Sequence, residues 1–239
     1  MNPLRRRIHT AMQTRGGAAA WTPASIPGLL LWLDANQITG LNDGDAVATW
    51  SDASGNGYNA TQGTASQRPI YKTGILNSRP VVRFDAVDDT LSNGTFAVNQ
   101  ANTWFAVVRT TGGDGAYRFV FDAATGTTRQ ALIYTVGTTK WTSYAGALVD
   151  ESGTTASSTW RSIQAIFNGA SSSLIVGGTT TAVNPGTDNL ANGYILGRVA
   201  NGSGFQFGGD IAEIGCYNSA ISGANLSALQ SYLNAKYGL

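Results

Sequence analysis

Short apolar runs, many of them alternating with polar residues, recur along the chain from Trp21 onward. Alternation with a period of two predicts β-strands with one buried face, and the Gly, Ser, Asn and Asp between the runs favour turns. The run 29–34 is apolar almost throughout, which indicates a strand covered on both faces. The other predicted strands are 47–50, 80–85, 104–109, 117–122, 130–136, 140–145, 159–167, 173–177, 194–197 and 209–218.

The chain ends in a pattern with helical spacing. Ser222 is a suitable N-cap, and Gly238 stands where a glycine commonly ends a helix. One stripe is apolar and is expected to pack on the strands: Leu226, Leu229, Tyr232 and Leu233. The polar positions are expected to face water: Asn225, Gln230, Asn234 and Lys236.

These patterns together predict an all-β fold. Many short strands at regular spacing are typical of two packed antiparallel sheets, so we expect a jelly-roll sandwich with one short C-terminal helix. Neither an internal repeat nor a second composition block is visible. We therefore expect residues 21–239 to form one domain that follows a distinct segment, residues 1–20.

Residues 1–20 form a basic N-terminal arm. Four of the fifteen lysines and arginines of the chain lie in it: Arg5, Arg6, Arg7 and Arg15. No acidic residue occurs before Asp34, and so polar a segment cannot fold by its own burial. A flexible tail is one interpretation; we favour an anchor that becomes ordered on a partner, held by the four arginines. We expect neither a signal peptide nor a membrane span, because no apolar stretch is long enough.

Three groups of segments carry a recognisable pattern: 31–35 with 47–52 and 55–57; 68–69 with 79–89; and 167–178 with 209–213 and the final helix. They resemble the laminin-G-like, concanavalin A-like jelly rolls of phage structural proteins and bacterial surface proteins. Ala86 stands where that family usually has glycine, so we expect a less sharp turn there. The resemblance implies the fold, whereas members of the family include sugar-binding modules, hydrolases and structural domains.

The residues argue against catalysis. Laminarinase-like jelly rolls place carboxylates at alternate positions of one strand, where two act as nucleophile and acid. No such triplet is present, and Asp210 and Glu213 are three apart, which predicts opposite faces. The one histidine, His9, lies in the arm, so the domain offers no Ser–His or Cys–His pair. Cys216 is expected to be a small buried side chain. We expect no catalytic residues and no enzyme activity.

Calcium is the one cofactor that the acidic residues suggest. Asp85, Asp88 and Asp89 cluster after a predicted strand, and Asp43 and Asp45 form a second, closer pair. Calcium prefers carboxylate and carbonyl oxygens, which loops can supply. The alternative is that these aspartates only cap turns by accepting backbone N–H groups. Both interpretations remain open for the cluster of three.

Glycan contact is the other candidate chemistry. Sugar sites need an aromatic ring beside amide or acidic groups, and most aromatic residues on the strands are expected in the core: Trp50, Trp141, Tyr144 and Trp160. Tyr58 differs because it lies in a loop of Gly and Asn. We therefore predict that Asn56, Tyr58 and Asn59 contact a ligand.

The low charge of the chain also bears on its expected function. Charged residues are 12% of the chain and the net charge is +1, so overall charge indicates neither a nucleic-acid nor a membrane partner. We expect a non-enzymatic structural, decoration or adhesion protein of a bacteriophage virion, present in many copies. Its arm would dock to other particle proteins, and its jelly roll would project outward towards cell-surface glycans. The alternatives are a free carbohydrate-binding module of a bacterial surface or secreted protein, and a degenerate glycan hydrolase.

Overall fold

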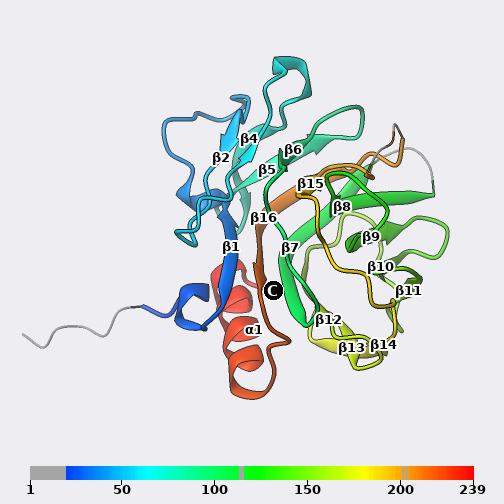
Figure 1. Ribbon diagram of the computed structural model, residues 1–239. Helices are drawn as coiled ribbons and strands as arrows, with labels where there is room; N and C mark the ends of the chain where they lie inside the picture. Colours follow the sequence, from blue (N-terminus) through cyan, green and yellow to red (C-terminus); the bar gives the residue numbers. More distant parts are fainter. Residues whose placement is uncertain (1–19, 113–115, 201, 203) are drawn as a thin grey trace, which may run out of the picture.

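The computed structural model describes residues 20–112, 116–200, 202 and 204–239. Two antiparallel sheets of eight strands each pack face to face, and one helix covers the outer face of one sheet (Figure 1). In spatial order, sheet A consists of β14 (Thr179–Val183), β13 (Ser172–Val176), β12 (Arg161–Phe167), β7 (Asn102–Gly112), β16 (Gly208–Tyr217), β5 (Arg79–Asp85) and β4 (Ile70–Leu76), with β1 (Leu29–Asp34) also paired to β16. Sheet B consists of β11 (Leu148–Asp150), β10 (Lys140–Tyr144), β9 (Ala131–Thr135), β8 (Tyr117–Ala123), β15 (Tyr194–Leu196), β6 (Leu91–Asn93), β3 (Ala60–Thr61) and β2 (Thr49–Trp50).

The predicted fold class is confirmed, and every predicted strand has a counterpart. The strands that the pattern missed are β3, β4, β6, β11 and β14. Three of them are outermost or nearly so, and the other two are only two or three residues long. Short and edge strands carry little apolar alternation because one side of them faces water, so a search for hydrophobic periodicity passes over them.

Aromatic side chains dominate the core between the two sheets. Trp50 and Trp141 are fully buried there, as predicted, and Trp104 stacks on Phe121 with ring centroids 4.1 Å apart. Cys216 is also fully buried, which confirms its expected role as a packing residue. These side chains come from both sheets, so the sandwich is held together by one continuous apolar layer.

Strand β16 runs through the middle of sheet A and is buried at all ten positions. It pairs with β7 along one edge and with β5 and β1 along the other. The β7–β16 ladder shifts register between Ile211 and Glu213. This irregularity carries both Asp210 and Glu213 to the outer side of the sheet, so the prediction that they face opposite sides is wrong.

Helix α1 (Gly223–Tyr237) lies where the pattern placed it. Ser222 is its N-cap, and Gly238 ends it in the left-handed region at φ 70°. Leu229, Leu233 and Tyr237 are the buried positions. No helical segment of the described chain, neither α1 nor the 3₁₀ turns η1 (Pro23–Ser25), η2 (Ala35–Gln37) and η3 (Ala65–Gln67), qualifies as a membrane span.

The expectation that the polar helix positions face water is wrong for Lys236. Its ammonium reaches down to the sheet, 2.7 Å from Asp34 Oδ2 and 2.8 Å from Glu213 Oε2. Tyr237 and Trp32 donate further hydrogen bonds to the Glu213 carboxylate, at 2.8 and 2.6 Å. Burial raises the pKa of Glu213, and the lysine opposes that rise. The helix therefore supplies the cation that two carboxylates on the sheet require.

We expect Lys236→Ala to lower the free energy of unfolding by about 3 kcal/mol, because it leaves two buried carboxylates without a counter-charge. Lys72→Ala is the matched control, since Lys72 pairs with Asp43 at the surface and its loss costs under about 1 kcal/mol. Urea denaturation of both variants measures the difference. Equal losses in the two variants would show that the cluster beneath α1 does not hold the helix.

Candidate functional site

The loop around Tyr58 is built on one carboxylate. Asp52 accepts hydrogen bonds from the backbone N–H groups of Trp32, Ser54 and Tyr58 at 2.9 to 3.0 Å. The Asn56 amide donates to the carbonyls of Leu29 and Leu30 at 3.1 and 3.0 Å. Loop 51–59 is thus tied to β1 by its own polar side chains.

The three residues predicted to contact a ligand all take part in this framework. Asn59 Oδ1 accepts the Asp52 N–H at 2.8 Å, and the Tyr58 ring meets the Phe96 ring edge-on at 5.1 Å. Tyr58 is half-buried, and its carbonyl accepts from Tyr194 at 2.7 Å. Ligand contact by Asn56, Tyr58 and Asn59 stays a prediction.

Asp85 organises the turn after β5. Its Oδ1 accepts the backbone N–H groups of Val87, Asp88 and Asp89 at 2.8, 3.3 and 3.4 Å. Ala86 takes φ 71° there, a left-handed geometry that favours glycine, so the turn is as sharp as a glycine would make it. The predicted softening of this turn is wrong. Asp85 does cap the turn, which is compatible with both interpretations of the cluster.

The carboxylates of Asp85, Asp88 and Asp89 gather within 4.8 Å of one another. Asp89 is buried, and burial together with the neighbouring Asp85 raises its pKa to about 7. Its Oδ2 accepts the Asp85 N–H at 2.9 Å. The three oxygens could be calcium ligands, and hydrogen bonding within the turn also explains their arrangement. Calcium binding stays a prediction.

The outer face of sheet B carries a second apolar layer that the sequence did not reveal. Leu132, Tyr134 and Trp141 point into the core, so the alternate residues of β9 and β10 point outward. Phe119, Ala131 and Ile133 are buried on this outer face, with Tyr117 and Tyr144 packed beside them. This outer face of sheet B is therefore rich in aromatic side chains, and some of them are shielded from solvent.

A groove of about 340 Å³ lies beside this layer, and we call it the threonine groove. Its principal lining residues are Tyr117, Thr135, Thr138, Thr142, Leu148 and Asp150. Thr142 Oγ1 donates to Asp150 Oδ1 at 2.5 Å and lies 2.7 Å from Thr135 Oγ1. Because the one hydroxyl proton of Thr142 goes to the carboxylate, Thr135 must be the donor of the second bond.

Exposed apolar side chains border the threonine groove. Leu148 is 46% exposed, and Phe205 is 38% exposed. The Phe205 ring meets the Tyr117 ring at 5.6 Å in an edge arrangement. Phe205 also sits at φ 54°, a conformation that is unfavourable for a bulky residue. The groove thus combines hydroxyl groups and a carboxylate with an aromatic border.

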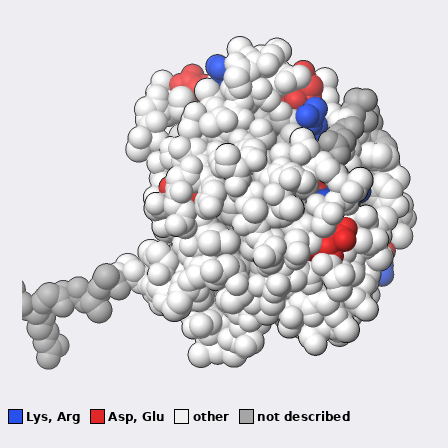
Figure 2. Space-filling view, viewed as in Figure 1, with Lys and Arg blue, Asp and Glu red and all other residues white. Residues whose placement is uncertain are grey.

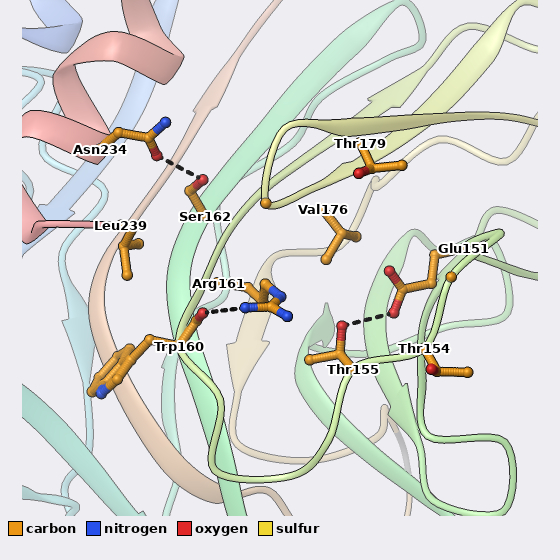
Figure 3. Close-up of a pocket in the computed structure, with 12 residues that line it drawn as sticks. Glu151, Thr154, Thr155, Trp160, Arg161, Ser162, Val176, Thr179, Asn234 and Leu239 are labelled. Atoms are coloured by element: carbon orange, nitrogen blue, oxygen red, sulfur yellow. Dashed lines mark hydrogen bonds between the residues drawn. The ribbon is translucent and has the colours of Figure 1, made fainter.

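A second hollow lies beside the loop that follows β11, and we call it the Arg161 pocket. It measures about 410 Å³, and its polar and aromatic walls come from Glu151, Thr154, Trp160, Arg161 and Thr179. Figure 3 shows the Arg161 guanidinium pointing into it from the start of β12, with Glu151 on the facing wall. Trp160 is held by Arg109, whose guanidinium carbon lies 5.0 Å from its ring centroid.

Neither of these two hollows was predicted from the sequence. Thr135 and Thr142 stand on neighbouring predicted strands joined by a short turn, so their pairing was a usable signal. Asp150 lies in the unpredicted strand β11, and Glu151 and Trp160 are brought together by a loop whose path no periodicity shows. The anchoring arginines Arg5, Arg6, Arg7 and Arg15 lie outside the described residues. Elsewhere the surface fits the composition, and Figure 2 shows few and scattered charged groups on one face.

No protein-family model matches the chain, and no curated protein matches it in sequence. Its fold is similar to that of a Trypanosoma rangeli sialidase solved with sialic acid, at 13% identity and a TM-score of 0.61. That match covers 88% of this chain but 33% of the sialidase, so the chain spans about one third of the sialidase length.

Two further solved structures are similar over more of their length. Domain 4 of AbnA, a GH43 extracellular arabinanase from Geobacillus stearothermophilus solved with arabinotriose, matches at 15% identity and a TM-score of 0.62. The match covers 84% of this chain and 97% of that domain. A GH54 α-L-arabinofuranosidase matches at 15% identity and a TM-score of 0.59, over 80% of this chain and 51% of that enzyme.

These neighbours are carbohydrate-active enzymes or domains of such enzymes, and the β-sandwich is the fold that they share with this chain. The expectation that the chain is not an enzyme is therefore corrected, because its neighbours are glycoside hydrolases. One ground for it has also failed, since Asp210 and Glu213 share one side of sheet A. At this identity the likeness shows the fold alone, so activity is not established either way.

We expect Asp89 to make the stability of the protein depend on pH near neutrality. Its pKa is about 7 in the folded chain against 3.8 in its ordinary state, so between these values the folded chain retains a proton that the unfolded chain has lost. Stability is then greatest below the lower value and falls as the pH rises through about 7, by up to about 1.4 kcal/mol per pH unit.

Urea denaturation of the protein and of Asp89→Asn at a series of pH values tests this expectation. The variant should lose that part of the decline, because an amide does not ionise. Asp45→Asn, at a turn near the chain start, is the control and should keep the wild-type profile. Identical profiles for the wild type and Asp89→Asn would contradict a raised pKa at this turn.

Proposed function

We propose that this chain is a saccharide-binding domain and that the threonine groove is its binding site. The observation that carries the proposal is the chain of hydrogen bonds from Thr135 through Thr142 to Asp150, lying beside exposed apolar side chains on the same sheet face. Sugars present both hydroxyl groups and apolar C–H faces. A site that fits them therefore needs polar and aromatic groups side by side.

The polar side chains of the groove are already held in position by hydrogen bonds to one another. Thr142 gives its proton to Asp150 Oδ1, and Thr138 is 3.5 Å from Asp150 Oδ2. A carboxylate has about four acceptor positions, so Asp150 retains acceptor capacity for ligand hydroxyls. Thr135 donates into the network, which leaves its own lone pairs as acceptors. Sugar hydroxyls would find acceptors without any rearrangement of the strands.

The apolar half lies along the border. Leu148 and Phe205 are two of the four large hydrophobic side chains that are exposed among the described residues. Tyr117 lines the groove and is half-buried, with Phe205 against its ring. Apolar side chains kept at the surface beside polar groups are typical of interaction sites. In the proposal, a sugar face packs on these rings while its hydroxyls reach Asp150.

The structural neighbours support a saccharide as the ligand. The AbnA domain that matches over nearly its whole length was solved with arabinotriose. We carry only the class of ligand to this chain, because 15% identity leaves no residue correspondence to use.

We further propose, as the finer form of this function, that residues 1–20 anchor the domain to a virion or another assembly. The Trp21 ring, which follows the arm in the sequence, lies 5.3 Å from the Tyr232 ring of α1, centroid to centroid. Helix α1 covers the outer side of sheet A (Figure 1). The threonine groove is on the outer side of sheet B. An anchor on one side of the sandwich would leave the groove facing outward, which suits a decoration or adhesion protein with a laminin-G-like domain.

Tyr117→Ala and Asp150→Asn are expected to weaken saccharide binding by about tenfold or more each. The first removes a ring that a sugar face would cover, and the second removes the charged acceptor. Calorimetric titration with arabinotriose, sialyllactose and cellotriose measures the affinities. Asp43→Asn changes an exposed acid that pairs with Lys72 and does not line the groove, so it should bind as the wild type does. If none of the three saccharides binds the wild type, or if Asp43→Asn loses as much as Asp150→Asn, the proposal fails.

Deleting residues 1–20 is expected to abolish attachment to the native assembly while leaving the sandwich folded, because all described strands start after Trp21. Co-sedimentation of the full chain and the shortened chain with material from the native host measures attachment. Equal sedimentation of both forms as free protein would contradict the anchor. Saccharide binding is measured separately, so it survives that outcome.

A further inference from the structure

We propose that the Arg161 pocket is a second ligand site, specific for a saccharide that bears a carboxylate, such as a uronic acid residue. The pocket measures about 410 Å³ and shares no lining residue with the threonine groove. Three of its features carry this inference: a guanidinium without an acidic partner, a carboxylate oxygen left unbonded on the facing wall, and an apolar border.

The first feature is the charge of Arg161. Among the described residues, no carboxylate lies within ion-pair distance of its guanidinium, and its one hydrogen bond is from Nη1 to the Trp160 carbonyl at 3.1 Å. The remaining N–H donors face the pocket (Figure 3). A guanidinium presents its donors in a planar fork that matches a carboxylate. The half-buried charge is therefore complementary to a ligand anion.

The backbone beside Arg161 leaves room for its side chain. Gly177 lies at φ 55°, and a Cβ at that position would come within 3.2 Å of Arg161 Cδ. Glycine thus provides both the turn after β13 and the space for the arginine stem. The Trp160 carbonyl accepts from the guanidinium, and the absence of a side chain at Gly177 leaves room for the arginine stem.

The second feature is the carboxylate of Glu151. Its Oε1 accepts the Trp141 N–H at 3.0 Å and the Thr155 hydroxyl at 3.1 Å. No hydrogen bond from the described residues reaches Oε2, so that oxygen is available to a ligand. A simple anion would be repelled by this charge, whereas a ligand hydroxyl would donate to it. A carboxylate at Arg161 and hydroxyls at Glu151 occur together in a sugar acid.

The third feature is the apolar border. Trp160 and Leu239 lie at one end of the pocket, and Leu239 is 41% exposed (Figure 3). A sugar ring could pack its C–H groups there while its polar groups reach inward. Thr154 and Thr179 add exposed hydroxyls on the opposite side. The pocket therefore offers a complete set of contacts for one acidic sugar residue.

The two hollows are separate, because two consecutive residues of the chain line different ones. Asp150, the last residue of β11, lines the threonine groove, and Glu151, the next residue, lines the Arg161 pocket. Their side chains therefore serve different ligands, so the pocket does not depend on the proposed function of the groove.

The experiment uses the full chain and two ligands that differ in one group, methyl glucuronide and methyl glucoside. Binding is followed by NMR titration of the arginine Nε and backbone amide signals. We expect the glucuronide to shift Arg161 Nε and the amides of residues 151–162, and the glucoside to bind about tenfold more weakly or not at all. Arg161→Gln should lose the glucuronide, and Arg161→Lys should retain part of the affinity because it keeps the charge.

Two control variants separate this site from general effects. Arg68 also donates to backbone carbonyls, those of Gln62 and Gly63, and lies outside both hollows, so Arg68→Gln should bind the glucuronide normally. Asp43→Asn should also bind it normally, because Asp43 pairs with Lys72 at the surface and lines neither hollow. Thermal melting of each variant shows whether it is folded.

Four results would overturn the inference. The first is the absence of shifts in the folded wild type when the glucuronide is added, and the second is binding of the glucoside at this pocket as tight as that of the glucuronide. The third is full affinity of the folded Arg161→Gln variant for the glucuronide. The fourth is equal affinity for sodium acetate, because it would reduce the site to one for simple anions. Loss of arabinotriose binding in the groove leaves all four measurements intact, so the two proposals fail separately.

Discussion

The packing of helix α1 and of the strands around β16 depends on neutralising two carboxylates on that buried strand. Asp210 and Glu213 lie on β16, which is buried at every position and joins three other strands. Asp210 is paired with Arg83 and Arg109 from the strands on either side. Glu213 is paired with Lys236 from α1. An unpaired charge at either position would cost several kcal/mol, of the order of a domain's total stability. The helix and the neighbouring strands are therefore held where their cations can pair with these carboxylates.

The same network reaches one of the two surface hollows. Arg109 bridges from Asp210 to the ring of Trp160, which borders the Arg161 pocket. The pocket is therefore built on the rigid centre of sheet A, although two of its walls belong to a loop. The threonine groove rests on sheet B in the same way, since its hydroxyls stand on paired strands. Sites supported by strands in this manner need little reorganisation when a ligand binds.

The sequence foretold the fold well and the sites poorly, for one physical reason. Burial produces a periodic pattern in the sequence, so β1 and α1 were placed closely, and Trp50 and Trp141 were correctly assigned to the core. Tyr144 and Trp160 were assigned to the core as well, but they are half-buried on the outer faces of the sheets. Pairing between side chains on different strands produces no such periodic pattern. The bulge before Glu213 reversed one expected orientation, and Lys236 turned inward because of carboxylates far away in sequence. Tyr58 drew attention because its loop is rich in glycine, yet the structure packs its ring against Phe96.

The central claim is that a saccharide lies in the threonine groove, and intermolecular nuclear Overhauser effects test it most directly. Threonine methyls and tyrosine rings would be labelled, and arabinotriose would be the ligand. The account predicts contacts from sugar C–H protons to the Tyr117 ring and to the methyls of Thr135 and Thr142. Contacts confined to Tyr58 would place the site in the loop beside β1 instead. The absence of any contact at saturating ligand would contradict saccharide binding in the groove.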